Sequence, residues 1–256
     1  MSVIHLKDIT FTRGERNILT DVQLQVNKGE QWVVLGRNGS GKTTILEMIN
    51  GYLFPSSGQV EVLSYKYGSV DLREARQHIG YISQSLLEKL TLRDPVWEVV
   101  ATGEYGYLRF YQVIPRETED KARAMLAELR MSHVADQPLG TLSQGERKKV
   151  MLARAMMTDP SILILDEPCS GLDLFEREQL LESISLLGKR DLTMIYVTHH
   201  IEEIVPVFTH IALIHQGRIP AHGPKKQVLT PELLKDVYDV PVTIDWVNDR
   251  PWIRVI

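Results

Sequence analysis

The sequence predicts an α/β fold with a mostly parallel sheet and a helical insertion. Three observations support this prediction. A glycine-rich segment at 36–44 lies between a short apolar run and an apolar face at helical spacing. Two more apolar runs, at 161–167 and 193–200, end in carboxylate or histidine side chains, and the pattern from about 86 to 158 is helical. Strands that alternate with helices favour a parallel sheet that binds its ligands at the carboxyl ends of the strands.

The first part of the chain, up to about residue 31, predicts antiparallel strands, because apolar and polar residues alternate and turn residues separate them. A further strand pair is expected around 59–63, after a turn at 55–58. Short buried strands are expected at 32–35 and 79–84, and the second of these ends at Gln84.

The later elements follow from proline, glycine and apolar spacing. Asp94-Pro95 predicts a helix with Asp94 as its cap and proline at its first position, and Pro115 predicts another helix start. A helix is expected from about Leu174 to Leu187, ended by Gly188. An edge hairpin over 211–218, one short helix after 230 and a last strand at 240–244 complete the prediction.

The segment Gly36-Arg37-Asn38-Gly39-Ser40-Gly41-Lys42-Thr43-Thr44 fits the phosphate-binding loop pattern G-x-x-x-x-G-K-[ST]. Its glycines permit positive φ angles and a close approach of the backbone to a ligand. Successive N–H groups then converge on an anion at a helix N-terminus, where the potential is positive. Lys42 is expected to reach the β- and γ-phosphates, and the Thr43 hydroxyl is expected to bind Mg²⁺. The loop alone predicts a nucleotide without saying which one.

Composition excludes several classes of protein. The 256 residues, 43% of them hydrophobic, are enough for one or two closely joined subdomains. A net charge of −4 gives no indication of affinity for nucleic acid or acidic lipid. No apolar run approaches the roughly 20 residues that cross a bilayer, and residues 1–8 lack the pattern of a secretion signal. The single cysteine, Cys169, excludes an internal disulfide and suits a reducing cytoplasm.

Five stretches stand in an order that resembles the ATP-binding cassette (ABC) ATPases over nearly the whole chain. They are 36–44, Gln84, Leu142-Ser143-Gln144-Gly145-Glu146, Asp166-Glu167 and His199. The short Ser-x-Gly signature that opens a helix before the acidic strand is specific to this family. The resemblance implies one domain, 1–256: a phosphate-loop NTPase (RecA-like) core, about 1–85 and 159–256, with an N-terminal antiparallel β-subdomain and an inserted helical signature subdomain at about 86–158.

The resemblance also implies ATP hydrolysis with Mg²⁺, in a head-to-tail dimer that encloses two ATP molecules. Residues 36–44 of one copy would hold the triphosphate and the metal ion. In the other copy Ser143 and Gly145 of the signature 142–146, which also includes Glu146, would close over the γ-phosphate. A helix N-terminus suits this task, because it offers free N–H groups to an anion.

The remaining roles fall on strand ends. By the same resemblance, Asp166 would hold Mg²⁺ through water, and Glu167 would orient and deprotonate the attacking water. Gln84 would contact the metal ion and the water, and His199 would contact the γ-phosphate. Residues 170–173 resemble the loop that crosses the dimer interface.

The signature departs from the usual Leu-Ser-Gly-Gly-Gln of the family. Gln144 replaces a glycine and Glu146 replaces the glutamine. Because Ser143 and Gly145 remain, we expect the γ-phosphate contact to remain.

Two further departures concern single residues. Arg13 stands where an aromatic residue commonly stacks on adenine; a guanidinium can stack on a base, and a solvated turn residue is the alternative. Of the pair His199-His200, the family pattern favours the first for the γ-phosphate and makes the second a helix-start residue. Cys169 is expected to be a packing residue.

The resemblance implies the ATP-binding and hydrolysing subunit of a transporter, with a second cassette and separate transmembrane subunits as partners. We expect it in the cytoplasm, peripheral on the inner face of the cell membrane, with no direct contact to nucleic acid. Residues 84–112 and the tail at 237–244 are similar to importer cassettes of the iron-siderophore and vitamin B12 type. An aromatic cluster at 105–111 either packs in the core or docks the membrane partner. The alternative is a soluble ABC ATPase that acts on DNA or ribosomes.

Overall fold

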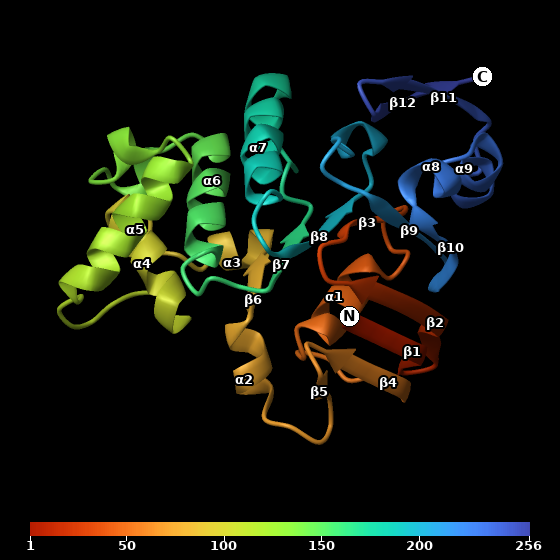
Figure 1. Cartoon of the computed structure of the whole chain (residues 1–256), viewed down its shortest axis with the longest axis horizontal. Coiled ribbons are helices and arrows are strands. Elements are labelled where there is room, and N and C mark those ends of the chain that lie inside the picture. Colours follow the sequence, from red (N-terminus) through yellow and green to blue (C-terminus); the bar gives the residue numbers. More distant parts are fainter.

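A six-stranded sheet in the order β10-β9-β3-β8-β7-β6 forms the centre of the computed structural model, which describes residues 1–256 (Figure 1). Its strands are β3 (Gln31–Leu35), β6 (Ile79–Ile82), β7 (Ile162–Asp166), β8 (Thr193–Thr198), β9 (His210–His215) and β10 (Arg218–Pro224). All neighbours in this sheet are parallel except β9 and β10, which form the predicted edge hairpin. The prediction of a mostly parallel sheet is therefore confirmed.

A second, antiparallel sheet in the order β2-β1-β4-β5 covers one side of this core. It consists of β1 (Ser2–Arg13), β2 (Arg16–Asn27), β4 (Ser57–Val62) and β5 (Tyr65–Lys66). Its apolar face packs on helix α1 (Lys42–Ile49) and on β3, so that Leu6, Leu19 and Val34 share one hydrophobic cluster with Leu46. This packing fixes the loop between β3 and α1, which holds the glycine-rich segment.

A helical lobe lies on the other side of β6, away from the antiparallel sheet (Figure 1). It contains α3 (Gln84–Leu87), α4 (Val96–Tyr105), α5 (Arg116–Glu128), the 3₁₀ turns η1 (Ser132–Val134) and η2 (Leu139–Thr141), and α6 (Gln144–Ala155). Helix α2 (Leu72–Gln77) precedes β6. Asp94 does not cap α4 as predicted: Pro95 is the N-cap, and Asp94 is buried and pairs with Arg109 at 3.2 Å.

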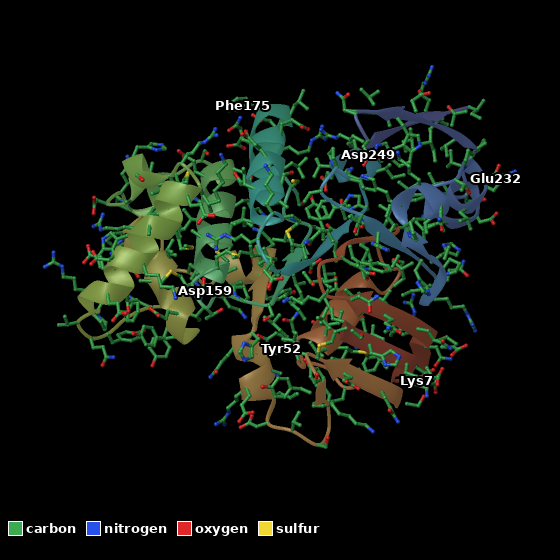
Figure 2. All side chains as sticks on the ribbon, in the orientation of Figure 1. Lys7, Tyr52, Asp159, Phe175, Glu232 and Asp249 are labelled. Carbon is green, nitrogen blue, oxygen red and sulfur yellow. The ribbon has the colours of Figure 1, made fainter.

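The C-terminal part contains more structure than the sequence predicts. Helix α7 (Leu174–Leu187) ends at Gly188 as expected, and η3 (Ile201–Glu203) follows β8. Instead of one helix and one strand, the tail forms α8 (Lys225–Val228), α9 (Pro231–Tyr238) and the hairpin β11 (Val242–Val247) and β12 (Arg250–Val255). Asp249, at the turn of this hairpin, pairs with Lys225 at 2.6 Å and Lys226 at 2.9 Å (Figure 2).

None of the helices is both long enough and apolar enough to cross a membrane.

Candidate nucleotide-binding and catalytic site

The glycine-rich loop leaves β3 and enters α1 in a conformation that needs its glycines. Gly39 and Gly41 have φ angles of 77° and 110°. Residues that carry a Cβ atom rarely adopt such angles. A Cβ atom at Gly36 would lie 2.3 Å from the carbonyl oxygen of Ile214, and one at Gly41 would lie 2.7 Å from a methyl group of Leu19. Because no side chain caps the first turn of α1, its N–H groups remain free for a ligand.

Lys42 is the buried cation of this loop. Its side chain is 5% exposed, and its Nζ donates to the carbonyl oxygens of Gly36 at 2.9 Å and Arg37 at 3.1 Å. Burial lowers the pKa of this ammonium group, and the nearby charges of Glu167 and Asp166 oppose that effect. The cation is thus held over the loop, with its carboxylate partner Glu167 at 3.6 Å.

Ser40 supplies the clearest sign that this loop suits an oxygen-rich ligand. Its hydroxyl oxygen is buried and has no hydrogen-bond partner. A buried polar group without a partner typically costs about 1–3 kcal/mol. A triphosphate would fit these features together: the glycines of the loop, the uncapped start of α1, the buried Lys42 and the Ser40 hydroxyl. Arg37, Asn38, Gly39 and Thr43 lie on the exposed side of the loop, and Thr44 is half-buried.

Two carboxylates stand at the end of β7, next to Lys42. Asp166 is the last residue of the strand, and burial followed by the charge of Glu167 raises its pKa to about 6, while Lys42 opposes the rise. Oxygen ligands of this kind suit Mg²⁺, which usually binds through one or two carboxylates together with phosphate oxygens. No group of three or more His, Cys, Asp or Glu side chains forms a metal site by itself. The residues therefore fit a magnesium ion that arrives with a nucleotide.

Glu167 has a strained backbone that the sequence does not reveal. Its φ angle is 46°, although it is not glycine and it precedes Pro168, which favours an extended conformation. A hydrogen bond from its N–H to the carbonyl oxygen of Val197, 3.0 Å long, ties it to the neighbouring strand β8. Its Oε1 lies 3.2 Å from Nδ1 of His199. The structure therefore aims this carboxylate between Lys42 and His199.

His199 and His200 follow β8, and the buried carboxylate of Glu203 lies against the end of that strand. Glu203 accepts hydrogen bonds from the hydroxyl of Thr198 at 2.6 Å and from that of Tyr196 at 2.8 Å. His200 is the N-cap of η3, so its prediction as a helix-start residue is confirmed. Glu203 was not predicted; a carboxylate inside the apolar run that follows His200 is the signal that could have indicated it.

Gln84 does not end a strand as predicted, because it is the first residue of helix α3. Strand β6 ends at Ile82, because Ser83 accepts a hydrogen bond from the N–H of Leu86 and starts helix α3. The side chain of Gln84 accepts from Nζ of Lys148 at 2.9 Å and donates to Glu88 at 3.2 Å. It makes no hydrogen bond to the loop, to Asp166 or to Glu167, and it connects instead to α6 of the helical lobe.

The signature occupies the start of α6. Ser143 and Glu146 form a capping box: the Ser143 hydroxyl accepts from the N–H of Glu146 at 3.2 Å, and Glu146 accepts from the N–H of Ser143 at 2.8 Å. The N–H of Gly145 donates to Oε1 of Glu176 on α7 at 3.1 Å. Figure 1 shows α6 separated from α1 by β6 and β7, so one chain does not bring the signature to its own phosphate loop. No motif in the sequence predicts this contact of Glu176.

Two other predicted residues make no side-chain hydrogen bond to the loop, to Asp166 or to Glu167. Arg13 ends β1 and is exposed, with its guanidinium carbon 5.9 Å from the centre of the Phe11 ring. Cys169 is buried at 4% exposure beside Tyr196, which agrees with its prediction as a packing residue.

Comparison with known proteins agrees with this geometry. A sequence model of the ABC transporter family matches residues 19–170. The uncharacterized ABC transporter ATP-binding protein YlmA of Bacillus subtilis (strain 168) is 39% identical over 254 residues, which are 98% of this chain and 96% of the relative. The ADP conformation of an ATP-binding cassette of an ABC transporter has a TM-score of 0.81 and 26% identity, covering 93% of this chain and 99% of that one.

A dimeric cassette in a post-hydrolysis state, bound to ADP and Pi, also matches, with a TM-score of 0.73 and 25% identity over 86% of this chain and 98% of that one. These comparisons confirm the predicted fold, with ATP as the ligand and ATP hydrolysis as the reaction. They favour a transporter ATP-binding protein over the soluble alternative. The chain belongs to the ABC transporter family, as one of its ATP-binding cassettes.

Proposed function

We propose that this cassette is the ATPase subunit of a membrane transporter and that it works through an ATP-dependent head-to-tail dimer. One observation carries the proposal. The phosphate loop with Lys42 and the signature with Ser143 each stand at a helix N-terminus, where N–H groups can bind an anion, and the fold keeps them apart within one chain. A second copy, turned head to tail, would complete each site.

In this proposal, residues 36–44 hold the triphosphate, and Thr43 and Asp166 hold Mg²⁺. Bound ATP with Mg²⁺ supplies the phosphoryl group that is transferred to water. Lys42 neutralises phosphate charge in a buried setting, where its effect is stronger than in water. Glu167 accepts the proton of the attacking water as the general base, and His199 fixes the γ-phosphate beside it. Gln84 links this region to the helical lobe through Lys148.

The partner copy contributes the hydroxyl of Ser143 and the N–H of Gly145. That N–H already donates to an anionic oxygen, the carboxylate of Glu176, at 3.1 Å. It is therefore an anion-binding donor at a helix N-terminus. The first turn of α7, directly after residues 170–173, also exposes Leu174 and Phe175, at 67% and 73% (Figure 2). Apolar exposure beside the signature suits a face that a second copy covers.

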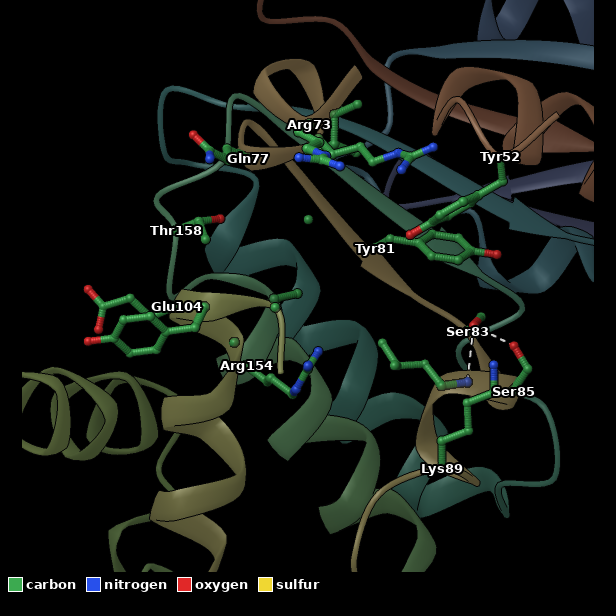
Figure 3. Close-up of a pocket in the computed structure, with 18 of the residues that line it drawn as sticks. Tyr52, Arg73, Gln77, Tyr81, Ser83, Ser85, Lys89, Glu104, Arg154 and Thr158 are labelled. Atoms are coloured by element: carbon green, nitrogen blue, oxygen red, sulfur yellow. Dashed lines mark hydrogen bonds between the residues drawn. The ribbon is translucent and has the colours of Figure 1, made fainter. Parts of the chain in front are cut away.

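A membrane partner would dock in the cleft between the core and the helical lobe. This cavity measures about 790 Å³. Figure 3 shows Tyr52 and Tyr81 on the core side and Glu104 and Arg154 on the helical side. The adjacent loop leaves Tyr111 exposed at 92%. Aromatic residues that gather at an exposed surface favour interfaces, so we place a cytoplasmic loop of the transmembrane subunit here, and with it a peripheral position of the cassette on the inner face of the membrane.

The dimer is tested with Glu167→Gln, which keeps the size of the side chain but cannot take the proton. Loss of a general base slows a reaction by roughly 10²–10⁴-fold. We expect this variant to bind ATP, to turn over slowly and to elute as a dimer on gel filtration with ATP and Mg²⁺, but as a monomer with ADP. Adding Ser143→Arg should abolish the dimer and leave ATP binding to each copy. A Glu167→Gln protein that stays monomeric with ATP bound would refute the proposed mechanism.

Docking is tested by recovery of partners from a detergent extract of membranes. We expect the wild type to recover a protein with several membrane spans, and Tyr111→Asp to lose it while ATP binding is unchanged. Val255→Asp, which changes an apolar residue exposed at 70% on the distant hairpin, is the matched control. Recovery of ribosomes or DNA with no membrane protein would support the soluble alternative.

A further inference from the structure

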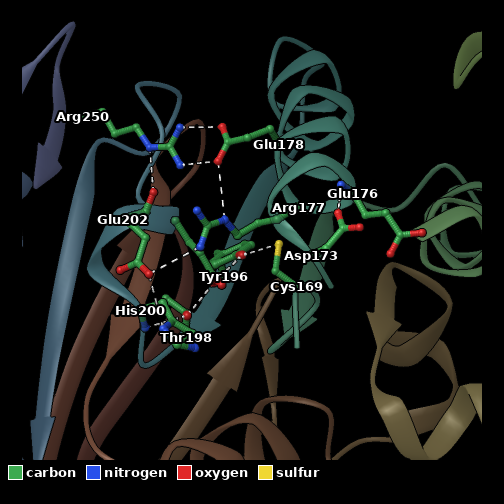
Figure 4. Close-up of polar contacts among 11 residues, drawn as sticks. Cys169, Asp173, Glu176, Arg177, Glu178, Tyr196, Thr198, His200, Glu202 and Arg250 are labelled. Atoms are coloured by element: carbon green, nitrogen blue, oxygen red, sulfur yellow. Dashed lines mark hydrogen bonds and ion pairs between the residues drawn. The ribbon is translucent and has the colours of Figure 1, made fainter. Parts of the chain in front are cut away.

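The C-terminal hairpin β11–β12 is pinned to the catalytic side of the molecule by Arg250 (Figure 4). The Arg250 side chain is 14% exposed, and both terminal nitrogens donate to the carboxylate of Glu178 on α7, at 2.7 and 2.8 Å. Its Nε donates to the carbonyl oxygen of Glu202 at 2.6 Å. One guanidinium therefore joins three elements, and it uses the forked geometry that lysine lacks.

Glu202 lies in η3, the turn that begins at His200 and so directly follows His199. Carbonyl groups at the end of a short helix have no partner inside it, and Arg250 supplies one from outside. The Glu202 carboxylate is in turn 3.5 Å from Arg177 and 3.6 Å from Nδ1 of His200. Arg250 and Glu202 therefore connect η3 to the first half of α7.

The turn that carries His199 is therefore anchored from two sides. On the sheet side, the buried Glu203 holds Thr198, the residue before His199. On the outer side, Arg250 holds the backbone of Glu202, three residues after His199. His199 itself has only Glu167 at 3.2 Å and the ring of His200, whose centre is 4.0 Å away. Its position depends on the turn more than on its own contacts.

We infer that Arg250 is a positioning residue for ATP hydrolysis: by clamping η3 to the hairpin and to α7, it holds His199 in place against Glu167. The inference rests on the proposed role of His199 at the γ-phosphate. It assigns a function to a hairpin that lies outside the segment 19–170 matched by the family model.

The test compares Arg250→Ala and Arg250→Lys with a matched control, Arg254→Ala. Arg254 lies on the same strand β12 and is 74% exposed, but it pairs only with Asp245 inside the hairpin. A displacement of about 1 Å at a catalytic group can cost roughly 100-fold, so we expect both Arg250 variants to lower kcat by at least about fivefold. Their Kd for ATP and Mg²⁺ and the kcat of Arg254→Ala should stay within about twofold of wild type.

A spectroscopic measurement separates positioning from general loss of stability. With ¹⁵N-labelled histidine, the imidazole signals of His199 should shift in Arg250→Ala and Arg250→Lys and stay in place in Arg254→Ala. If Arg250→Ala does not fold, Arg250→Lys decides the question, because it keeps the charge and one hydrogen bond but loses the fork. Unchanged His199 signals in the Arg250 variants would overturn the inference.

His199→Ala distinguishes failure of the clamp from failure of the proposed function. If His199→Ala leaves hydrolysis at the wild-type rate, the proposed role of His199 is wrong and the inference falls with it. If His199→Ala is slow but Arg250→Ala behaves like Arg254→Ala, only the clamp is wrong. We expect a third result: in single turnovers, adding Arg250→Ala to His199→Ala lowers the rate by less than about twofold more, because both changes remove the same interaction.

Discussion

Removing Glu176 should strengthen the ATP-dependent dimer. In the single chain the Glu176 carboxylate accepts the hydrogen bond of the Gly145 N–H at 3.1 Å. This N–H is the donor that the γ-phosphate of the partner copy would need. One N–H cannot bond well to both the Glu176 carboxylate and the γ-phosphate. The contact must therefore break in each of the two copies when the dimer forms. The carboxylate also repels the incoming phosphate, and its loss should favour the bound state on both grounds.

The size of the effect follows from the contact itself. A hydrogen bond to a charged group contributes about 1.5–3 kcal/mol, and the half-buried position of Glu176 argues for the lower end. Two such contacts amount to about 3 kcal/mol, which is roughly 100-fold in a dissociation constant at about 1.4 kcal/mol per tenfold. We therefore expect Glu176→Ala to lower the dimer Kd by roughly 100-fold, and Glu176→Gln, which keeps a neutral acceptor, by less.

The assay is sedimentation velocity over a range of protein concentrations with ATP and Mg²⁺, in a Glu167→Gln background that prevents turnover. Glu182→Ala is the control, because it removes the same charge from the same helix at a position that pairs only with Arg130, at 3.6 Å on the surface. A control variant that gains as much would assign the effect to net charge. A Glu176→Ala dimer no tighter than its parent would refute the competition between carboxylate and phosphate.

Three further predictions concern binding, reactivity and acid stability. Lys42→Ala should weaken equilibrium binding of ATP and Mg²⁺ at least about tenfold, because truncating a buried charge partner typically costs a few kcal/mol; unchanged affinity would contradict the assignment of the loop. Burial raises the pKa of the Cys169 thiol to about 12, so its reaction with a disulfide reagent at pH 8 should be roughly 1,000-fold slower than that of a free cysteine with pKa about 8.5, and rapid reaction of the folded protein would show that the site opens. The hydrogen bond from Arg250 lowers the pKa of Glu178, so this pair contributes stability above the unfolded pKa of about 4.3 and loses it as the pH falls further. The melting temperature of Arg250→Ala should therefore lie below that of wild type at pH 7. A difference in melting temperature that does not narrow by pH 3 would exclude this linkage.

Local patterns in the sequence predict the frame of the site well. Glycine spacing, the apolar runs and the acidic strand end at Asp166-Glu167 each depend on neighbours in the chain, and the structure brings Lys42, Glu167 and His199 within hydrogen-bonding or ion-pairing distance. These residues meet because parallel strands end at one edge of the sheet.

The remaining features depend on contacts between distant parts of the chain. Gln84 bonds to Lys148 in the helical lobe, Gly145 bonds to Glu176 on α7, and Arg250 bonds to Glu178 on the same helix. No periodicity or motif encodes such pairs, because the two partners of each pair lie far apart in the sequence. Ser83 shows a local failure as well: its hydroxyl caps α3 and ends β6 earlier than the apolar pattern indicates.

The left-handed backbone of Glu167 has a consequence for how this protein can be engineered. A φ angle of 46° before proline costs on the order of 1 kcal/mol for a residue of this type. Asparagine tolerates that conformation better, so Glu167→Asn should relieve strain while it removes the carboxylate that faces His199. Libraries selected only for heat resistance or expression would enrich such replacements at position 167, and the selected variants would lack the proposed general base. Selection for a more robust cassette must therefore include ATP turnover in every round.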